Sequence, residues 1–335
     1  MTESRKSQRK RLTRERNSNA LILTGQGTSL RIESGALVIK QGFSHYPQQR
    51  ESHRYFKGDL ALPRIIILLD GSGSLSFDVL NWLGEQGVAL ARIKADGDVA
   101  VVASGAGFTA NPDNLRWQYA TQKDGAARLA FAADLIARKM DSSVETIEGQ
   151  FGQGRFAGTA IAKAKEAAKR LRTQAISDMN DIRAIEGESA AAYFAAWVDI
   201  EMQWTAAARY PAPDQWRTYR SRSSTLTGRK PRNWKASHPI NAMLNYAYAV
   251  KAARLQIQAV ADGFDPNAGI MHHSRPDFPA YVYDLIEPER PKVDAAILSF
   301  AKSRKFSGAD FVLRKDGVCR LSPQLARMVA TVISA

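Results

Sequence analysis

The sequence predicts an α+β protein with a small β-rich N-terminal domain and a larger all-α domain. Short runs of Leu, Ile and Val, separated by Gly and Ser turns, dominate residues 20–102, a pattern typical of strands. Beyond Asn111-Pro112, apolar residues recur at helical spacing over much longer segments. We therefore predict three regions: a basic tail at 1–19, a β-rich domain at 20–110 and a helical domain at 111–335.

The β-rich domain contains several expected strands, which cover residues 20–23, 30–32, 37–39, 50–56, 64–69, 88–93 and 99–102. A helix is expected over residues 76–86, with Ser76 as its N-cap. Its buried face would consist of Leu75, Val79, Leu80 and Leu83. The Gly-rich stretch at 70–74 is interpreted as a tight turn into this helix. A phosphate-binding loop is disfavoured, because no Gly-Lys-Ser/Thr closes the stretch.

The second domain is predicted to be helical along most of its length. The expected helices cover residues 115–119, 126–140, 157–176, 178–210, 240–261, 293–299 and 322–334. One short strand is expected at 311–313. Pro288 would delay the start of the helix that follows Asp284, since proline is tolerated only near a helix start.

The composition points to a polyanionic partner. The 335 residues include 47 Lys and Arg against 33 Asp and Glu, a formal charge of +14. Such an excess favours nucleic acid as the partner first and an anionic membrane second. A basic protein without a polyanionic partner is the remaining alternative. The first twenty residues carry seven basic and two acidic side chains. We expect this tail to be disordered and solvated, with a role in holding DNA left open.

The cellular compartment is predicted from absences in the sequence. Cys319 is the single cysteine, so the chain can form neither an internal disulfide nor a zinc–cysteine cluster, which fits a reducing cytoplasm. No apolar run follows the basic tail as in a secretory signal. No segment reaches the ~18–20 apolar residues that cross a bilayer. We expect a cytoplasmic protein without membrane association.

A basic segment without any acid runs from residue 215 to 261. Basic side chains contact phosphates, and aromatic rings such as Trp216, Tyr219 and Trp234 could stack on unpaired bases. A solubilising loop is the weaker alternative. The candidate DNA-binding residues are Arg217, Arg220, Arg222, Arg229, Lys230, Arg232 and Lys235.

Four side chains could bind a divalent metal. Glu186 shares the apolar face of its predicted helix with Ile182 and Tyr193, and an ionised carboxylate there needs a partner or a metal. His272 follows a Gly-rich turn, and Asp284 and Glu287 stand three residues apart, on one side of a helical turn. Taken alone, Asp284 and Glu287 could merely stabilise a helix N-terminus. We expect His273 to be a surface residue or a neighbour of the ligands.

The helix at 240–261 adds polar candidates. Asn241, Asn245 and Tyr248 share one face. Asn241 and Tyr248 could hydrogen-bond a ligand carboxylate or a phosphate, or tie helices together, and the residues alone do not decide between these roles.

Several of these motifs resemble the adaptation integrases of CRISPR systems, which insert new spacers into CRISPR arrays. The resemblance lies in Ile185-Glu186-Gly187, Gly269-x-x-His272, Asp284-Leu285-x-Glu287-x-x-Arg290-Pro291 and the Asn/Tyr helix at 239–248, in this order. Further residues of the first long helices match more loosely: Arg116, Gln118, Tyr119, Arg128, Ala137 and Lys139. For most of the basic residues among these, a solvated helix face is the expected role. Pro288 departs from the charged residue that is usual there.

The resemblance implies an enzyme that joins DNA. Glu186, His272 and Glu287 would bind one Mg²⁺ or Mn²⁺, with Asp284 as a further ligand or a base. The assignment of Asp284 or Glu287 as direct ligand stays open. Asn241, Tyr248 and Arg290 would support the site. A DNA 3′-hydroxyl would attack a phosphodiester of the CRISPR repeat and leader, without an enzyme nucleophile.

The resemblance also implies partners and alternatives. The N-terminal domain would be β-sandwich-like and would form the interface of a homodimer, bridged by a small ferredoxin-like subunit. A casposase-like transposon integrase shares these motifs, although the expected elements include no extra C-terminal DNA-binding domain. A second alternative is not an enzyme: a non-catalytic DNA-binding protein that retains the fold.

Overall fold

The structure is a computed structural model that describes residues 20–42, 51–69, 71–94, 99–103, 111–152, 154–198, 200–206, 208–222, 235–275 and 278–334. The predicted tail at 1–19 lies outside these residues. So do Arg229, Lys230, Arg232 and Trp234 of the basic segment.

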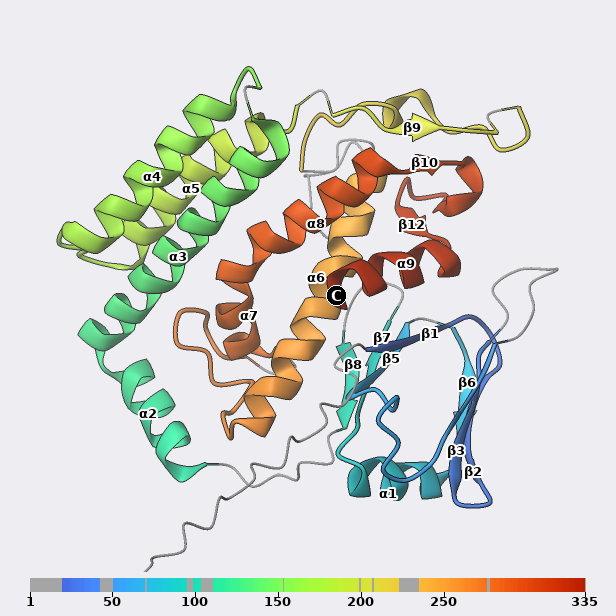
Figure 1. The fold of residues 1–335 in the computed structure, drawn as a ribbon. Coiled ribbons are helices and arrows are strands. Elements are labelled where there is room, and N and C mark those ends of the chain that lie inside the picture. Colours follow the sequence, from blue (N-terminus) through green and yellow to red (C-terminus); the bar gives the residue numbers. More distant parts are fainter. Residues whose placement is uncertain are drawn as a thin grey trace, which may run out of the picture.

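The N-terminal part is built from two four-stranded sheets (Figure 1). One sheet has the order β1 (Leu21–Thr24), β5 (Ile65–Leu69), β7 (Ala89–Ile93) and β8 (Val99–Ala103). The other has the order β4 (Ser52–Tyr55), β3 (Ala36–Lys40), β2 (Thr28–Glu33) and β6 (Gly73–Leu75). Leu23, Ile66 and Leu90 of the first sheet share a core with Leu30 and Ile39 of the second. The predicted β-sandwich-like architecture is therefore confirmed.

Two expectations in this region were wrong. Residues 73–75 form strand β6 rather than a turn, because they pair in parallel with residues 28–30 of β2. Gly73 is required there, since a Cβ would lie 2.1 Å from the carbonyl oxygen of Thr28. Leu75 and Leu80 are exposed, whereas Val79, Trp82 and Leu83 form the buried stripe of α1 (Phe77–Glu85). A nine-residue helix buries one stripe, and Leu80 falls outside it.

The C-terminal part is mostly helical, as expected. Its helices are α2 (Pro112–Lys123), α3 (Gly125–Phe151), α4 (Ala157–Thr173), α5 (Met179–Ala195), α6 (Pro239–Ala261), α7 (Ala280–Ile286), α8 (Arg290–Ser303) and α9 (Pro323–Ser334). Helices α3, α4 and α5 pack as one group beside α6 and α8 (Figure 1).

Three details of this domain correct the predictions. Helix α3 runs on to Phe151, and α5 ends at Ala195 rather than at residue 210. Beyond α5 the chain turns to bury Trp197 against Tyr193 and Tyr219. Unexpected short strands also interrupt the helical domain: β9 (Gln203–Trp204) pairs with β10 (Lys305–Phe306), and β12 (Cys319–Leu321) pairs with β11 (Phe311–Leu313), the one strand that was expected here.

The sheet that contains β1, β5 and β7 joins the two parts. Its second face packs against α6 and α9, and Ile67, Leu69 and Ile93 belong to the large core that also contains Ile240 and Val250 of α6. This explains the uninterrupted apolar run at 65–69, since a strand covered on both faces needs no polar side. Within the described residues, no helix is both long and apolar enough to cross a membrane.

Candidate active site

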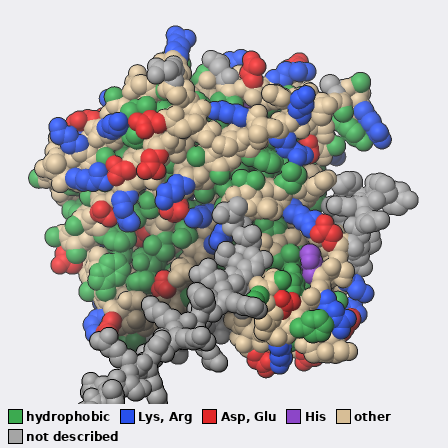
Figure 2. All heavy atoms as spheres, in the orientation of Figure 1, with side chains coloured by type: hydrophobic (Ala, Val, Ile, Leu, Met, Phe, Trp, Pro, Cys, Tyr) green, Lys and Arg blue, Asp and Glu red, His purple; other side chains and the backbone are tan. Residues whose placement is uncertain are grey.

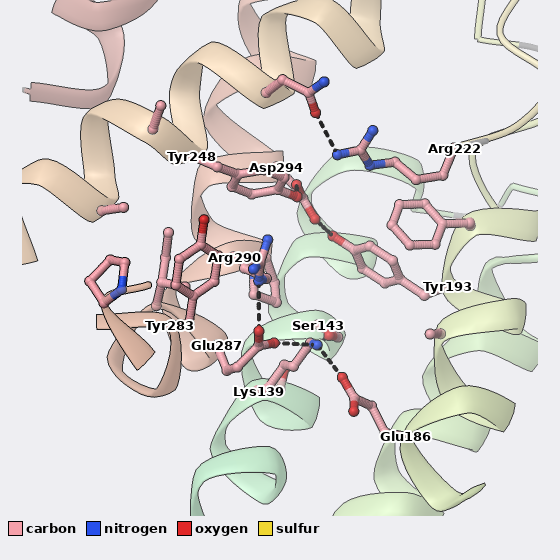
Figure 3. Close-up of a pocket in the computed structure, with 18 of the residues that line it drawn as sticks. Lys139, Ser143, Glu186, Tyr193, Arg222, Tyr248, Tyr283, Glu287, Arg290 and Asp294 are labelled. Carbon is pink, nitrogen blue, oxygen red and sulfur yellow. Dashed lines mark hydrogen bonds and ion pairs between the residues drawn. The ribbon is translucent and has the colours of Figure 1, made fainter. Parts of the chain in front are cut away.

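Three side chains from distant segments meet at the centre of the candidate site (Figure 3). Lys139 projects from α3, Glu186 from α5, and Glu287 from the turn that follows α7. The Lys139 Nζ lies 2.6 Å from Glu287 Oε2 and also forms an ion pair with Glu186 Oε1. Glu287 is buried, and the Lys139 and Glu186 side chains are 16% and 28% exposed. One ammonium group therefore joins two of the predicted ligands.

Glu287 is held by two cations. Besides Lys139, Arg290 donates from Nε to Glu287 Oε1 at 2.9 Å. Burial alone would raise the pKa of Glu287, but Lys139 and Arg290 lower it to about 2. Burial would lower the pKa of Lys139, and the two glutamates outweigh that and raise it. Glu287 is therefore held as a carboxylate and Lys139 as an ammonium group.

Pro288 lies in a 3₁₀ turn at Glu287–Glu289, between α7 and α8. Because this turn begins with Glu287, the proline is accommodated without displacing the glutamate from Lys139 and Arg290. The turn also separates Glu287 from Asp284, which lies within α7. The two carboxylates consequently have different partners.

Asp284 binds the loop that carries His272. It is 0% exposed and accepts backbone hydrogen bonds from Ile270 at 2.6 Å, Met271 at 3.0 Å and His272 at 2.9 Å. Its Oδ1 also lies 2.8 Å from the Nδ1 of His272. A carboxylate can only accept here, so Nδ1 carries the proton and Nε2 is the nitrogen that can bind a metal. His273 is exposed.

The first two helices of the domain hold the same loop from its other side. Gln118 donates to the carbonyls of Asp265 and Ala268, both at 2.8 Å. Gln122 donates to the Gly269 carbonyl at 2.6 Å, and Arg128 to that of Ile270 at 2.7 Å. Gln118 is 0% exposed. The solvated face expected for the basic residues is wrong for Lys139, whose side chain is 16% exposed, whereas Arg116 is exposed. Sequence reasoning missed Gln122, for which no signal stood out.

A cavity of about 1000 Å³ opens beside Lys139, Glu186 and Glu287. Its wall includes Asp294, which the sequence reasoning missed. Asp294 accepts hydrogen bonds from Tyr193 at 2.9 Å and from Tyr248 (Figure 3). Burial raises the pKa of Asp294 to about 6, against the lowering effect of these tyrosines. A second cavity of about 300 Å³ is lined by both Glu186 and His272.

The Asn/Tyr face of α6 ties segments together. Asn241 donates to the Ser221 carbonyl at 2.9 Å, and Asn245 accepts from Arg222 at 2.9 Å. The guanidinium groups of Arg222 and Arg290 lie 5.8 Å and 4.9 Å from the ring centre of Tyr248. These contacts anchor the start of the basic segment at the large cavity.

The described basic residues differ in their surroundings. Arg222 lines the large cavity, Arg217 pairs with Asp214 at 3.2 Å, Arg220 is exposed, and Lys235 is partly buried. Trp216 and Tyr219 are buried in the core, so the expectation that they stack on bases is wrong. Figure 2 shows Lys and Arg side chains interspersed with acidic ones across one face of the molecule.

The side chains at the site are of the types that bind a divalent metal, but the distances between them are too long for three of them to share one ion. Carboxylate oxygens and an imidazole nitrogen are ligands of Mg²⁺ and Mn²⁺. Among the described residues, however, no three His, Cys, Asp or Glu side chains come close enough to hold one ion. A positive charge, the Lys139 ammonium, already lies between Glu186 and Glu287.

The chain is similar to known proteins over 63% to 94% of its length in the two matches that follow. The chain is 24% identical over 326 residues to a CRISPR-associated endonuclease Cas1 from Pyrobaculum aerophilum, covering 94% of this chain and 95% of that protein. It is 31% identical over 215 residues to a CRISPR-associated exonuclease Cas4/endonuclease Cas1 fusion from Rhodospirillum rubrum. That match covers 63% of this chain but only 33% of the fusion.

Solved structures share the fold. A casposase bound to its integration product superposes with a TM-score of 0.72 at 22% identity, covering 94% of this chain and 82% of that one. A Cas6–RT–Cas1–Cas2 complex gives 0.64 at 15% identity, covering 93% of this chain and 31% of that one. The family model described as CRISPR associated protein Cas1 matches residues 21–334. The chain therefore belongs to the Cas1 family of CRISPR-associated proteins.

Proposed function

We propose that this protein is a metal-dependent DNA integrase and endonuclease that inserts spacer DNA into a CRISPR array. Family membership supports the general activity, and two observations in the site support the chemistry. Glu186 and Glu287 converge on a single cation, while Asp284 fixes the ring of His272, which lines a cavity with Glu186.

Glu186, Glu287 and the Nε2 of His272 would hold one Mg²⁺ or Mn²⁺. When bound, such an ion polarises the scissile phosphate and stabilises charge on the attacking and leaving oxygens. The space between the two carboxylates already suits a positive charge, as the position of Lys139 indicates. The chain itself supplies no nucleophile in this proposal, because the DNA 3′-hydroxyl attacks the phosphodiester.

We assign Asp284 as a positioning residue and Glu287 as the direct ligand. Both oxygens of Asp284 are occupied by three backbone N–H groups and the His272 ring. A ligand histidine commonly donates its second ring N–H to a carboxylate, which fixes its orientation and raises its basicity. Glu287 instead faces Lys139 and the large cavity.

The basic residues at and near the cavity would bind DNA phosphates. Arg222 and Arg290 line the cavity beside Tyr248, and together they offer positive charge close to the two glutamates. Arg217, Arg220 and Lys235, with Arg229, Lys230 and Arg232, would follow the backbone of the prespacer or of the CRISPR repeat. Such contacts provide affinity rather than sequence specificity.

We propose a homodimer formed through the N-terminal domain, with a small ferredoxin-like subunit as the bridge. The domain exposes Leu75, Phe77 and Leu80 on β6 and α1, and Phe77 is 85% exposed. Apolar side chains grouped in this way commonly mark protein interfaces. One structural relative is an assembly that contains Cas1 and Cas2, which supports a partner subunit of that kind.

A casposase-like integrase is the second candidate, favoured by the superposition with a casposase at a TM-score of 0.72. The two candidates share the joining chemistry and differ in the target. A non-catalytic DNA-binding protein is disfavoured because Glu186 lines two cavities, one together with Glu287 and the other together with His272.

The test is strand transfer of a short duplex with free 3′-hydroxyl ends into a supercoiled plasmid, with Mn²⁺ or with EDTA. Wild type is compared with Glu186→Ala, His272→Ala and the matched control His273→Ala. We expect Mn²⁺-dependent joining that only Glu186→Ala and His272→Ala abolish. Joining that survives Glu186→Ala, or none with the partner subunit supplied, would overturn the proposal. Preference for a plasmid with a CRISPR leader and repeat separates adaptation from casposase-like integration.

A further inference from the structure

Lys139 occupies the position between two proposed metal ligands. Its Nζ lies 2.6 Å from Glu287 Oε2 and is ion-paired with Glu186 Oε1. Among the described ion pairs, it is the one cation that contacts both glutamates, since Arg290 pairs with Glu287 alone. Its segment, α3, packs against both α5 and the turn that carries Glu287.

We propose that Lys139 is a built-in counter-ion that is displaced when a divalent ion binds. In the metal-free protein, its ammonium group keeps Glu186 and Glu287 together. When the metal arrives, the flexible side chain of Lys139 moves into the adjoining cavity, which it already lines. This inference rests on the proposed function, because it takes both glutamates as ligands.

The electrostatics support a role before metal binding. Two carboxylates that share a partly buried site repel each other, and the repulsion grows as the local dielectric falls. Glu287 is buried and Glu186 is partly covered, so a compensating charge is needed between them. An ordinary salt bridge between two helices would need only one carboxylate, whereas Lys139 contacts both.

The geometry supports displacement. A bound Mg²⁺ lies at about 2.0–2.1 Å from its oxygen ligands. Lys139 already contacts one oxygen of each glutamate within hydrogen-bonding distance. An ammonium and a divalent cation cannot both take the space between these oxygens, because like charges at such a distance repel strongly. Lys139 therefore competes with the metal ion for the two glutamates. Before the ion binds, the same lysine holds the two carboxylates close together.

The test measures metal affinity and stability rather than joining. Lys139→Met and Lys139→Gln remove the charge, and Lys165→Met is the matched control, an exposed lysine of α4 that pairs with Glu148. Mn²⁺ binding is followed by electron paramagnetic resonance, and the thermal midpoint is measured in EDTA and in Mn²⁺. We expect Mn²⁺ to bind at least about tenfold more tightly in both Lys139 variants, because the repulsion between the ammonium group and the metal ion is removed. We also expect the EDTA midpoint to fall by about 2–4 °C and saturating Mn²⁺ to restore it.

The outcomes separate the two levels of the proposal. If wild type binds no Mn²⁺, or if Glu186→Ala binds it equally well, the proposed metal site itself fails. If wild type binds Mn²⁺ through Glu186 but both Lys139 variants bind it equally or more weakly, the counter-ion inference fails and the site stands. Should Lys139→Met not fold in EDTA, Lys139→Gln keeps a hydrogen-bonding group and decides the question.

Discussion

The His272 Nδ1 lies 2.8 Å from Asp284 Oδ1, and Asp284 is fully enclosed. The same carboxylate accepts three backbone N–H groups from the loop that carries the histidine. One side chain therefore sets the loop conformation, the tautomer and the ring orientation of His272. This pairing gives Asp284 a role different from that of Glu287, although the two stand three residues apart in the sequence.

Replacing Asp284 by Asn should destabilise the protein and abolish joining. The amide keeps the size of the side chain but turns a donor toward backbone N–H groups that need acceptors. Hydrogen bonds to a charged group contribute roughly 1.5–3 kcal/mol, so we expect a loss of about 2–3 kcal/mol in urea unfolding. Asp134→Asn, at an exposed carboxylate of α3, is the control. Equal stability of the two variants would contradict this role for Asp284.

Replacing Gln118 by Ala should weaken Mn²⁺ binding without changing the ligands themselves. The buried amide donates to two carbonyls and accepts from the Asp265 N–H, so the loop that leads to His272 would lose three contacts. We expect weaker metal binding by titration and nearly unchanged DNA affinity. Gln174→Ala, at the end of α4, serves as control. Metal affinity equal to that of the control would show that the loop keeps its shape without Gln118.

Asp294 should make stability fall as pH rises between about 4 and 6. Its folded-state pKa of about 6 lies above the unfolded value near 3.9. The folded protein therefore holds the proton more tightly, and this stabilisation is complete below pH 4 and lost by about pH 6. Tyr193, Tyr248, Arg222 and Arg290 surround the carboxyl and moderate the shift.

The measurement compares wild type with Asp294→Asn in EDTA across this window. The stability of wild type relative to the variant should decrease by about 2–3 kcal/mol from pH 4 to pH 6.5. Glu287 acts in the opposite direction and at lower pH, since its lowered pKa of about 2 means that its contribution is lost only on strong acidification. A difference that stays constant with pH would refute the assignment to Asp294.

Arg222→Ala should weaken DNA binding and reduce its salt dependence. If Arg222 contacts one phosphate, its loss lowers the slope of log K against log salt by about 1. Fluorescence anisotropy over a range of salt concentrations measures the slope, with Arg314→Ala in the turn between β11 and β12 as control. An unchanged slope would place Arg222 away from the DNA.

Phe77→Asp should convert a dimer to a monomer. The phenyl ring is 85% exposed beside Leu75 and Leu80, and a charge at that place would oppose association. Light scattering after size exclusion gives the mass, and Val312→Asp, at an exposed residue of β11, is the control. A Phe77→Asp protein that remains dimeric would remove this surface from the interface.

Local pattern was enough for much of the fold. The apolar run at 65–69 predicted a buried strand, and β5 occupies it with cover on both faces. The presence of most helices was also predictable, because the apolar residues that a helix buries recur at a fixed spacing along the sequence. The end of α5 was not predictable. The helix ends at Ala195, and Trp197 just beyond it packs against Tyr219, which is distant in the sequence.

The sequence by itself determined which chemistry the site can carry: Glu186 on an apolar helix face, His272 after a Gly-rich turn, and Asp284 and Glu287 in order. Only the tertiary structure decided how these residues are divided. Asp284 turns to the His272 loop, and Glu287 turns to Lys139, which is 148 residues away in the chain. From the sequence, Lys139 was expected to be a solvated helix residue, because the charge of a side chain does not reveal which distant residue it pairs with. The packing of α3 against α5 and against the turn that carries Glu287 brings Lys139 within reach of both glutamates.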